Sequence, residues 1–196
     1  MTSDQVLSHF RETDALLEGH FLLSSGLHAS TYLQCALALQ FPSDAAKFGR
    51  AIADHLVEAG LANAETVASP AIGGLVIGFA VAQALNKRFI WTERQDGAMT
   101  LRRGFSLKPG ERIIVVEDVI TTGGSTRECI AALKQNGGDV VAAASIVDRS
   151  NGIADVGVPR IALAQLDVPG FEKDACPMCL SGSEPYKPGS RSAASK

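Results

Sequence analysis

The chain has 196 residues and a mass of 20.5 kDa, enough for one domain with a sizeable core and short for two. With 46% hydrophobic and 20% charged residues, its composition is that of an ordinary globular protein, which argues against wholesale disorder. The formal net charge of −3 argues against a general nucleic-acid binder and against a protein of the membrane surface.

The four cysteines are too few and too unevenly spaced to form a disulfide scaffold. Charged residues, among them Asp4 and Arg11, interrupt the N-terminal segment, so no secretory signal peptide is expected. The predicted compartment is therefore a reducing cytoplasm.

One uncharged run, residues 66–86, is long enough to cross a bilayer. It contains Pro70 and three glycines, however, and it opens with a strand-like run. We interpret it as a buried strand, a glycine loop and a buried helix, the pattern of a parallel sheet that helices cover on both faces. A membrane span is therefore not expected.

Strand-like and helix-like segments alternate along the chain. A short helical start precedes a strand over residues 30–39, a helix from Pro42 that ends at Gly60, a strand near Val67, a helix that ends near Leu85 and a strand over 88–92. Residues 93–104 are polar and follow neither period. A strand over 111–117, a helix over 125–136, and strands over 140–147 and 160–166 follow. This alternation predicts an α/β fold with a doubly wound, mostly parallel sheet.

No repeat or linker divides the chain, so a single domain over residues 1–196 is expected. Beyond Gly170 the sequence is irregular, and its last residues are small and polar. Residues 171–196 are therefore predicted to form an irregular tail.

The most informative segment, residues 113–126, reads Ile-Ile-Val-Val-Glu-Asp-Val-Ile-Thr-Thr-Gly-Gly-Ser-Thr. Its apolar residues predict a central strand, with Glu117 and Asp118 at the carboxyl end, where open α/β sheets bind ligands. The loop that follows offers N–H groups, hydroxyls and the N-terminus of a helix capped by Ser125, which together suit a phosphate.

Two carboxylates beside a phosphate loop fit a ligand that also carries hydroxyl groups, because carboxylates are strong hydrogen-bond acceptors. A ribose 5-phosphate combines both, and the carboxylates would also stabilise positive charge on its ring. The simpler alternative is an acidic turn whose threonines and serine only cap the next helix. The coincidence of the strand, the acid pair and the loop favours the ligand-binding interpretation.

These residues resemble the signature of the phosphoribosyltransferases, and the chain is most similar to the orotate phosphoribosyltransferases. Further similar blocks lie at residues 16–21, 23–28, 102–105, 147–149 and 176–179. The resemblance implies a phosphoribosyltransferase fold with a small N-terminal hood over residues 1–40. It also implies transfer of phosphoribosyl from 5-phosphoribosyl 1-diphosphate (PRPP) to orotate, giving orotidine 5′-monophosphate and diphosphate in pyrimidine synthesis.

The resemblance also implies roles for individual residues. Glu117 and Asp118 would hold the ribose hydroxyls, and the rest of the PRPP-binding segment would be Val119, Ile120, Thr121, Thr122, Gly123, Gly124 and Ser125. Thr121 and Arg149 would contact orotate. The diphosphate loop would be Ala71, Ile72, Gly73 and Gly74, and a mobile catalytic loop would carry Arg94, Arg102 and Arg103. Mg²⁺ would be held mainly through PRPP rather than by protein ligands.

The resemblance further implies a homodimer in which the mobile loop acts on the partner's site, with no nucleic acid or membrane as partner. The sequence departs from better-known orotate enzymes at three places. Ser24 stands where they have lysine, Ile72 and Gly73 replace a Tyr-Lys pair, and the loop cations are mostly arginines.

Two other functions stay open at this point. The PRPP loop is common to purine and other pyrimidine phosphoribosyltransferases, and a PRPP-sensing regulator could share the fold without catalysis. A regulator would carry a DNA-binding helix-turn-helix or a broad basic face, and the acid-containing N-terminus offers neither.

Cys176 and Cys179 have the spacing of a metal knuckle, but a four-coordinate site needs two more ligands. All four histidines lie in the N-terminal third of the chain. A shared metal site and a redox pair stay open, and the preferred interpretation is two reduced thiols that hold a turn of the tail.

Overall fold

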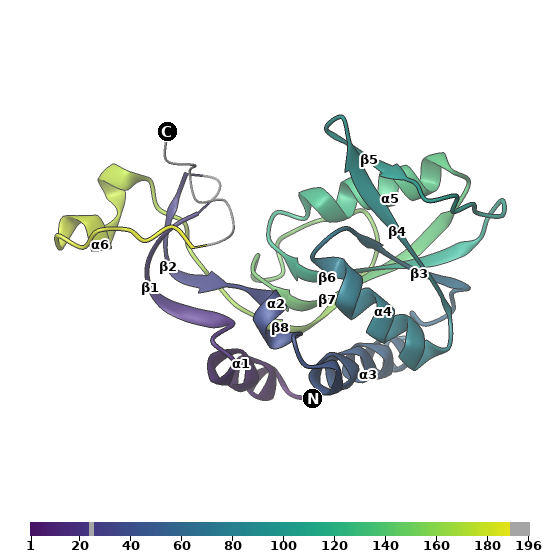
Figure 1. The fold of residues 1–196 in the computed structure, drawn as a ribbon, viewed down its shortest axis with the longest axis horizontal. Coiled ribbons are helices and arrows are strands. Elements are labelled where there is room, and N and C mark those ends of the chain that lie inside the picture. Colours follow the sequence, from purple (N-terminus) through teal and green to yellow (C-terminus); the bar gives the residue numbers. More distant parts are fainter. Residues whose placement is uncertain (24–25, 189–196) are drawn as a thin grey trace.

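The computed structural model describes residues 1–23 and 26–188. Its centre is a six-stranded sheet in the order β5-β4-β3-β6-β7-β8, in which only the edge pair β4 and β5 is antiparallel (Figure 1). The strands are β3 (Thr66–Pro70), β4 (Arg88–Gln95), β5 (Ala98–Leu101), β6 (Arg112–Ile120), β7 (Asp139–Asp148) and β8 (Arg160–Gln165). The predicted mostly parallel α/β sheet is confirmed.

Helices cover both faces of this sheet. The helices are α1 (Ser3–Glu12), α2 (Cys35–Ala38), α3 (Pro42–Glu58), α4 (Gly74–Leu85) and α5 (Gly124–Gln135). Successive residues of β6 face opposite sides: Ile114 and Val116 pack with α1, α3 and α4, whereas Ile113 and Val115 pack with α5. Every residue from 113 to 116 is therefore buried, which explains the unbroken apolar run.

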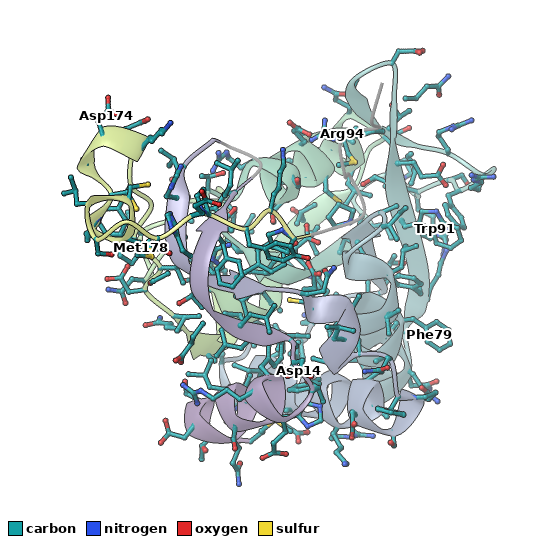
Figure 2. The ribbon with its side chains drawn as sticks, turned by 60° about the vertical axis from the view of Figure 1, so that its left-hand side comes forward. Asp14, Phe79, Trp91, Arg94, Asp174 and Met178 are labelled. Carbon is teal, nitrogen blue, oxygen red and sulfur yellow. The ribbon has the colours of Figure 1, made fainter. Side chains whose placement is uncertain are left out.

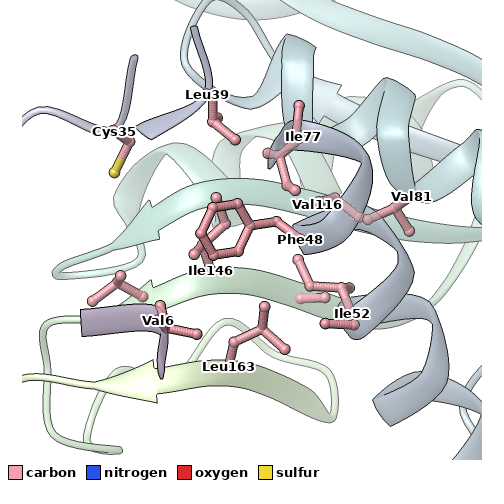
Figure 3. Close-up of a cluster of buried hydrophobic side chains, with 14 of the residues drawn as sticks. Val6, Cys35, Leu39, Phe48, Ile52, Ile77, Val81, Val116, Ile146 and Leu163 are labelled. Carbon is pink, nitrogen blue, oxygen red and sulfur yellow. The ribbon is translucent and has the colours of Figure 1, made fainter. Parts of the chain in front are cut away.

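The larger core lies between α3, α4 and the sheet. Phe48 and Ile52 of α3 and Ile77 of α4 meet side chains from the central strands, among them Val116 and Ile146 (Figure 3). The uncharged run 66–86 forms β3, a glycine turn and α4, as predicted, and no helix in the described ranges is both long and apolar enough to cross a membrane.

A second, smaller sheet stands apart from the first. It pairs β1 (Leu16–Leu22) with β2 (His28–Leu33) in an antiparallel hairpin, here called the N-terminal hairpin (Figure 1). The tail contributes a 3-10 helix, η1 (Lys173–Ala175), and α6 (Pro177–Leu180), and it bridges to the hairpin at Phe21–Tyr186 and His28–Phe171. Ser24, Ser25 and residues 189–196, which belong to segments discussed above, lie outside the described residues.

The predicted strand over residues 30–39 is wrong in part. The strand ends at Leu33, and its second half forms α2, while β1 was not predicted at all. Residues 28–33 do not alternate between buried and exposed positions, so they lack the regular period of a strand with one buried face.

The polar segment 93–104 is also more regular than predicted. β4 continues to Gln95 and turns through Asp96 and Gly97, both with positive φ, into β5. An Asp-Gly pair is a strong hairpin signal, since both of its residues tolerate the left-handed conformation that the tight turn requires. Because these strands are polar, the sequence pattern did not predict the β4–β5 hairpin.

Candidate active site

The acid pair lies near the end of β6, at the edge where β3 and β7 also end. The strand runs three residues beyond its predicted end and stops at Ile120, so both acids lie within it, and Glu117 pairs with Ser145 of β7. Glu117 is buried and Asp118 half-buried. Both carboxyl groups border the glycine turn before α4: a Cβ built on Gly73 would lie 2.9 Å from Asp118 Oδ2, and one on Gly74 would lie 3.3 Å from Glu117 Oε1.

The electrostatics of the pair are unusual for carboxyl groups. Burial raises the pKa of Glu117 to about 9, and the neighbouring Asp118 adds repulsion. Burial also raises the pKa of Asp118. Among the residues that the structure describes, no arginine or lysine forms an ion pair with either group. The ligand-free pair therefore retains a proton at neutral pH and would gain from a ligand that donates hydrogen bonds.

The loop after the acids leads into the N-terminus of α5. Gly123, not the predicted Ser125, is the N-cap: its φ of 75° is left-handed, and no side chain that the structure describes caps the helix. The arrangement needs glycine, since a Cβ at Gly123 would come within 2.9 Å of Val156 Cγ1. Arg127 holds the loop from behind by donating to Thr122 O at 2.8 Å and Asp155 O at 2.7 Å.

An uncapped helix N-terminus leaves backbone N–H groups free for an anion. Here that end opens into a cavity of about 400 Å³. The cavity is lined by Arg94, Glu117, Asp118, Val119, Ile120, Thr121, Thr122, Gly123, Gly124, Ser125, Thr126 and Glu128. The fold thus gathers the whole predicted PRPP-binding segment around one space.

The glycine turn over residues 71–74 borders a second, larger cavity. Ala71 donates its N–H to Thr92 O at 2.8 Å, and a cis peptide bond joins Ala71 to Ile72, whose side chain is exposed. The cavity measures about 1010 Å³ and is lined by Ala71, Ile72, Leu75, Trp91, Glu93, Arg94, Arg103 and Phe105. Arg94 lines both cavities, so they adjoin.

The three predicted loop arginines are held in ion pairs. Arg103 binds Glu93 with two hydrogen bonds of 2.7 and 3.0 Å, and Arg102 reaches the same carboxylate at 3.4 Å. The Arg103 guanidinium, helped by the Trp91 indole N–H, lowers the pKa of Glu93 to about 2. Arg94, on β4 like Trp91 (Figure 2), pairs with Glu128 of α5. Arg102 lines neither cavity.

Arg149 follows β7 directly beside the loop, and its N–H donates to Ile120 O at 2.8 Å. Its Nε atom is buried and has no hydrogen-bond partner among residues 1–23 and 26–188. Burial lowers the pKa of Arg149, while Cys35 and Tyr32 act in the opposite direction. A guanidinium N–H that is buried without a partner is costly, so this position suits an anionic ligand.

The backbone around Arg149 is fixed by Asp148, which is fully buried. Its carboxylate accepts from Ser150 Oγ at 2.6 Å, Gly152 N at 2.9 Å and Arg160 Nη1 at 2.8 Å. Burial opposes this charge, but the hydrogen bonds from Ser150 and Arg160 prevail and lower the pKa of Asp148. The Val-Asp-Arg block therefore combines one residue that anchors the turn with one whose buried Nε lacks a partner in the described part of the chain.

Cys35 and Tyr32 were not predicted as site residues. Cys35 lies buried on α2, and burial together with the charges of Asp118 and Glu117 raises the pKa of its thiol. No local pattern marks Cys35 or Tyr32, because each reaches the site only through the way α2 and the hairpin pack on the sheet.

Comparison with known proteins agrees with this geometry. Residues 44–174 match the family model described as phosphoribosyl transferase domain. An orotate phosphoribosyltransferase of Rhizorhabdus wittichii is 48% identical over 193 residues, covering 98% of both chains. One of Erythrobacter litoralis is 50% identical over 191 residues, covering 97% of this chain and 99% of the relative.

A solved structure shares the fold as well. The crystal structure of orotate phosphoribosyltransferase from Aeropyrum pernix superposes with a TM-score of 0.67 at 28% identity, covering 82% of this chain and 93% of that one. The chain therefore belongs to the phosphoribosyltransferase family of transferases, in the branch of the orotate phosphoribosyltransferases.

Proposed function

We propose that the protein transfers the phosphoribosyl group of PRPP to orotate, giving orotidine 5′-monophosphate and diphosphate in pyrimidine synthesis. One observation carries the proposal: a buried acid pair and an uncapped helix N-terminus line the same cavity. A sugar diol at the acids and a 5′-phosphate at the helix satisfy both ends of that cavity at once.

The acid pair has two tasks in this reaction. Glu117 and Asp118 accept hydrogen bonds from the ribose hydroxyls, which favours their ionised form over the protonated form of the ligand-free protein. Their negative charge then stabilises the positive charge that develops on the ribose ring as the diphosphate leaves. Thr121, Thr122, Gly123, Gly124 and Ser125 hold the 5′-phosphate, and Val119 and Ile120 position that loop.

Orotate binds beside the acid pair, at Arg149. Arg149 supplies a guanidinium that can form two parallel hydrogen bonds with the orotate carboxylate, and Thr121 lies next to it across β6 and β7. The unpartnered Nε of Arg149 supports this assignment. Transfer then proceeds directly between the two substrates, with no covalent enzyme intermediate.

The diphosphate lies at the glycine turn formed by Ala71, Ile72, Gly73 and Gly74. PRPP would carry Mg²⁺ into this pocket, and the ion would supply positive charge for the leaving diphosphate. The residues present fit a metal held through the substrate: Glu93, the acid that lines this cavity, is already bound by Arg103. Backbone groups of the turn and the loop arginines complete the pocket.

The loop arginines act once their ion pairs with Glu93 and Glu128 are broken. Arg94, Arg102 and Arg103 would then bring positive charge to the departing diphosphate and exclude water. Arg102→Ala or Arg103→Ala is therefore expected to lower kcat about 10- to 100-fold with a smaller change in the KM for PRPP, since the contact strengthens in the transition state. Steady-state kinetics measure the split, and an unchanged kcat in both variants would remove the loop from the mechanism.

A homodimer completes the proposal, with the loop of one subunit acting on the site of the other. An apolar groove between α3 and α4 supports it, because Val76 and Phe79 line the groove and are about half exposed, at 48% and 59%. Light scattering of the purified protein measures the mass, which is expected to be that of two chains.

All four cysteines are free thiols, which fits the proposed cytoplasmic location.

The deciding experiment offers PRPP and Mg²⁺ with orotate, uracil, adenine or hypoxanthine and follows loss of the base by absorbance. Consumption of orotate alone supports the proposal. Consumption of a purine instead would favour the purine enzyme, and PRPP binding without turnover of any base would favour the sensing regulator.

A further inference from the structure

Two histidines of the N-terminal hairpin meet two cysteines of the tail in a buried cluster outside the active site. The cluster comprises His20, His28, Cys176 and Cys179, and one donor atom from each lies within 4.8 Å of all the others. Cys176 is fully buried, and His20 and His28 are 8% and 4% exposed. The fold thus brings two histidines to the cysteine pair, although the sequence spacing predicts only two reduced thiols that hold a turn of the tail.

Three nitrogen–sulfur distances in the cluster lie close to the edges of a tetrahedron around zinc. His20 Nε2 lies 3.6 Å from Cys176 Sγ and 3.7 Å from Cys179 Sγ, and His28 Nδ1 lies 3.3 Å from Cys179 Sγ. Zinc bonds of about 2.0–2.1 Å to nitrogen and about 2.3 Å to sulfur give tetrahedral N···S edges of about 3.6 Å. The two nitrogens are 2.7 Å apart and would separate by about 0.6 Å around an ion.

The backbone explains how the two histidines come to face the same point. The register of β1 shifts between Glu18 and Phe21, so His20 and Phe21 are both buried although they are adjacent in a strand. His28 opens β2 and exchanges two backbone hydrogen bonds with Phe171, while His20 O accepts from Tyr186 N at 2.8 Å. The ligands thus lie at positions where the tail is already joined to the hairpin.

The outer surroundings also resemble those of a metal ligand. The second ring nitrogen of His20, Nδ1, lies 3.2 Å from Ser183 Oγ, a contact that fixes the orientation of the ring and leaves Nε2 directed into the cluster. Cys176 is the N-cap of the short helix α6 and Cys179 lies within the helix, so one turn presents both thiols. Two nitrogens and two sulfurs form the closed ligand set of a structural zinc, with no position open for a substrate.

We propose that His20, His28, Cys176 and Cys179 form a structural zinc site that joins the N-terminal hairpin to the tail. Binding releases the two thiol protons to solvent, and the thiolates and neutral imidazoles then coordinate one ion. The site makes up for a sparse apolar interior: Phe21 and Ala29 of the hairpin are buried but belong to neither core cluster of the main sheet. Figure 2 shows the tail, marked by Asp174 and Met178, on the opposite side of the molecule from Trp91.

Three other arrangements of these residues differ from a zinc site in what they require. A Cys176–Cys179 disulfide would leave the histidines without a shared ligand, and hydrogen-bonded thiols would need no metal. A cluster of two irons requires more space than donor atoms within 4.8 Å provide.

The first test measures metal content. Wild-type protein, purified without chelator, is expected to contain about one zinc per chain by plasma mass spectrometry. Cys179→Ser and His28→Asn should lose it, whereas the matched controls Cys129→Ser and His55→Asn should retain it. Cobalt exchanged into the wild type should give the visible bands of a tetrahedral site and a sulfur-to-cobalt charge-transfer band. Protein that contains no zinc and takes up none, or equal loss in the controls, would overturn the proposal.

The second test does not depend on variants that could fail to fold. Ser183→Ala removes only the outer contact of His20 and should weaken zinc about 10- to 100-fold in competition with a chelator. Removing zinc from the wild type should speed hydrogen exchange in residues 16–33 and 171–188 and leave the exchange of β6 and β7 unchanged. An unchanged affinity in Ser183→Ala together with uniform exchange would refute the assigned role.

Discussion

Glu117→Gln is expected to make the ligand-free protein more stable while it abolishes most of the activity. The folded protein holds a proton on Glu117 up to about pH 9, whereas the unfolded chain releases it near the ordinary pKa of 4.5. Folding therefore takes up a proton between these values, so the free energy of unfolding of the wild type falls as pH rises through this range. Glutamine is neutral at every pH and avoids this loss.

An upper limit can be set on the gain in the free energy of unfolding of Glu117→Gln. At about 1.4 kcal/mol per pH unit, the wild type loses at most about 3 kcal/mol between pH 4.5 and neutrality, so the variant should gain on the order of 1–3 kcal/mol at neutral pH. Chemical denaturation of both proteins at several pH values measures it. The difference should grow towards pH 9, and a difference that is flat or negative over that range would contradict the raised pKa.

The same variant should lose about 100-fold in kcat/KM for PRPP, because hydrogen bonds to a charged group contribute about 1.5–3 kcal/mol and the ring loses a stabilising charge. Asp118→Asn should behave similarly. Asp54→Asn, on the exposed face of α3, is the matched control and should retain wild-type kinetics. In the wild type the KM for PRPP should fall as pH approaches 9, since the ionised pair accepts the diol. Wild-type kinetics in both acid variants would remove the pair from the mechanism.

Arg149→Ala is expected to lower kcat/KM for orotate about 100-fold and leave the KM for PRPP nearly unchanged. The lost interaction is a charge-assisted pair in a half-buried position, which contributes about 3 kcal/mol at most. Arg149→Lys retains the charge but cannot form two parallel hydrogen bonds, so it should recover about 10-fold of the loss. Initial rates with each substrate varied in turn measure both values.

Arg50→Ala is the control for this experiment, because Arg50 is exposed on α3 and bonds only a backbone carbonyl within the described chain. An equal rise in both KM values for Arg149→Ala would indicate a disturbed loop rather than a lost orotate contact. The hydrogen bonds around Asp148 make that outcome unexpected, since they hold the turn without the Arg149 side chain.

Local pattern predicted most of the main sheet. β3, the glycine turn and α4 were identified from one uncharged run, and β6 with its acids from one apolar run, because a strand covered on both faces must be apolar throughout. The sequence contains the Asp-Gly turn of the β4–β5 hairpin, but the polar residues around it show no strand period, so the hairpin was not predicted. Ser125 had the right residue type for a cap, but the left-handed Gly123 begins the helix instead and leaves its N-terminus open.

The sequence by itself determined the acid pair, the glycine loop before α5 and the parallel sheet, since each depends on residues within one continuous segment and on the period of a strand or helix. Only the tertiary structure decided that Cys35 borders the acids, that the loop arginines are paired with Glu93 and Glu128, and that His20 and His28 meet Cys176 and Cys179. His20 and Cys176 are 156 residues apart, and no local preference of the chain encodes which distant segments will pack together.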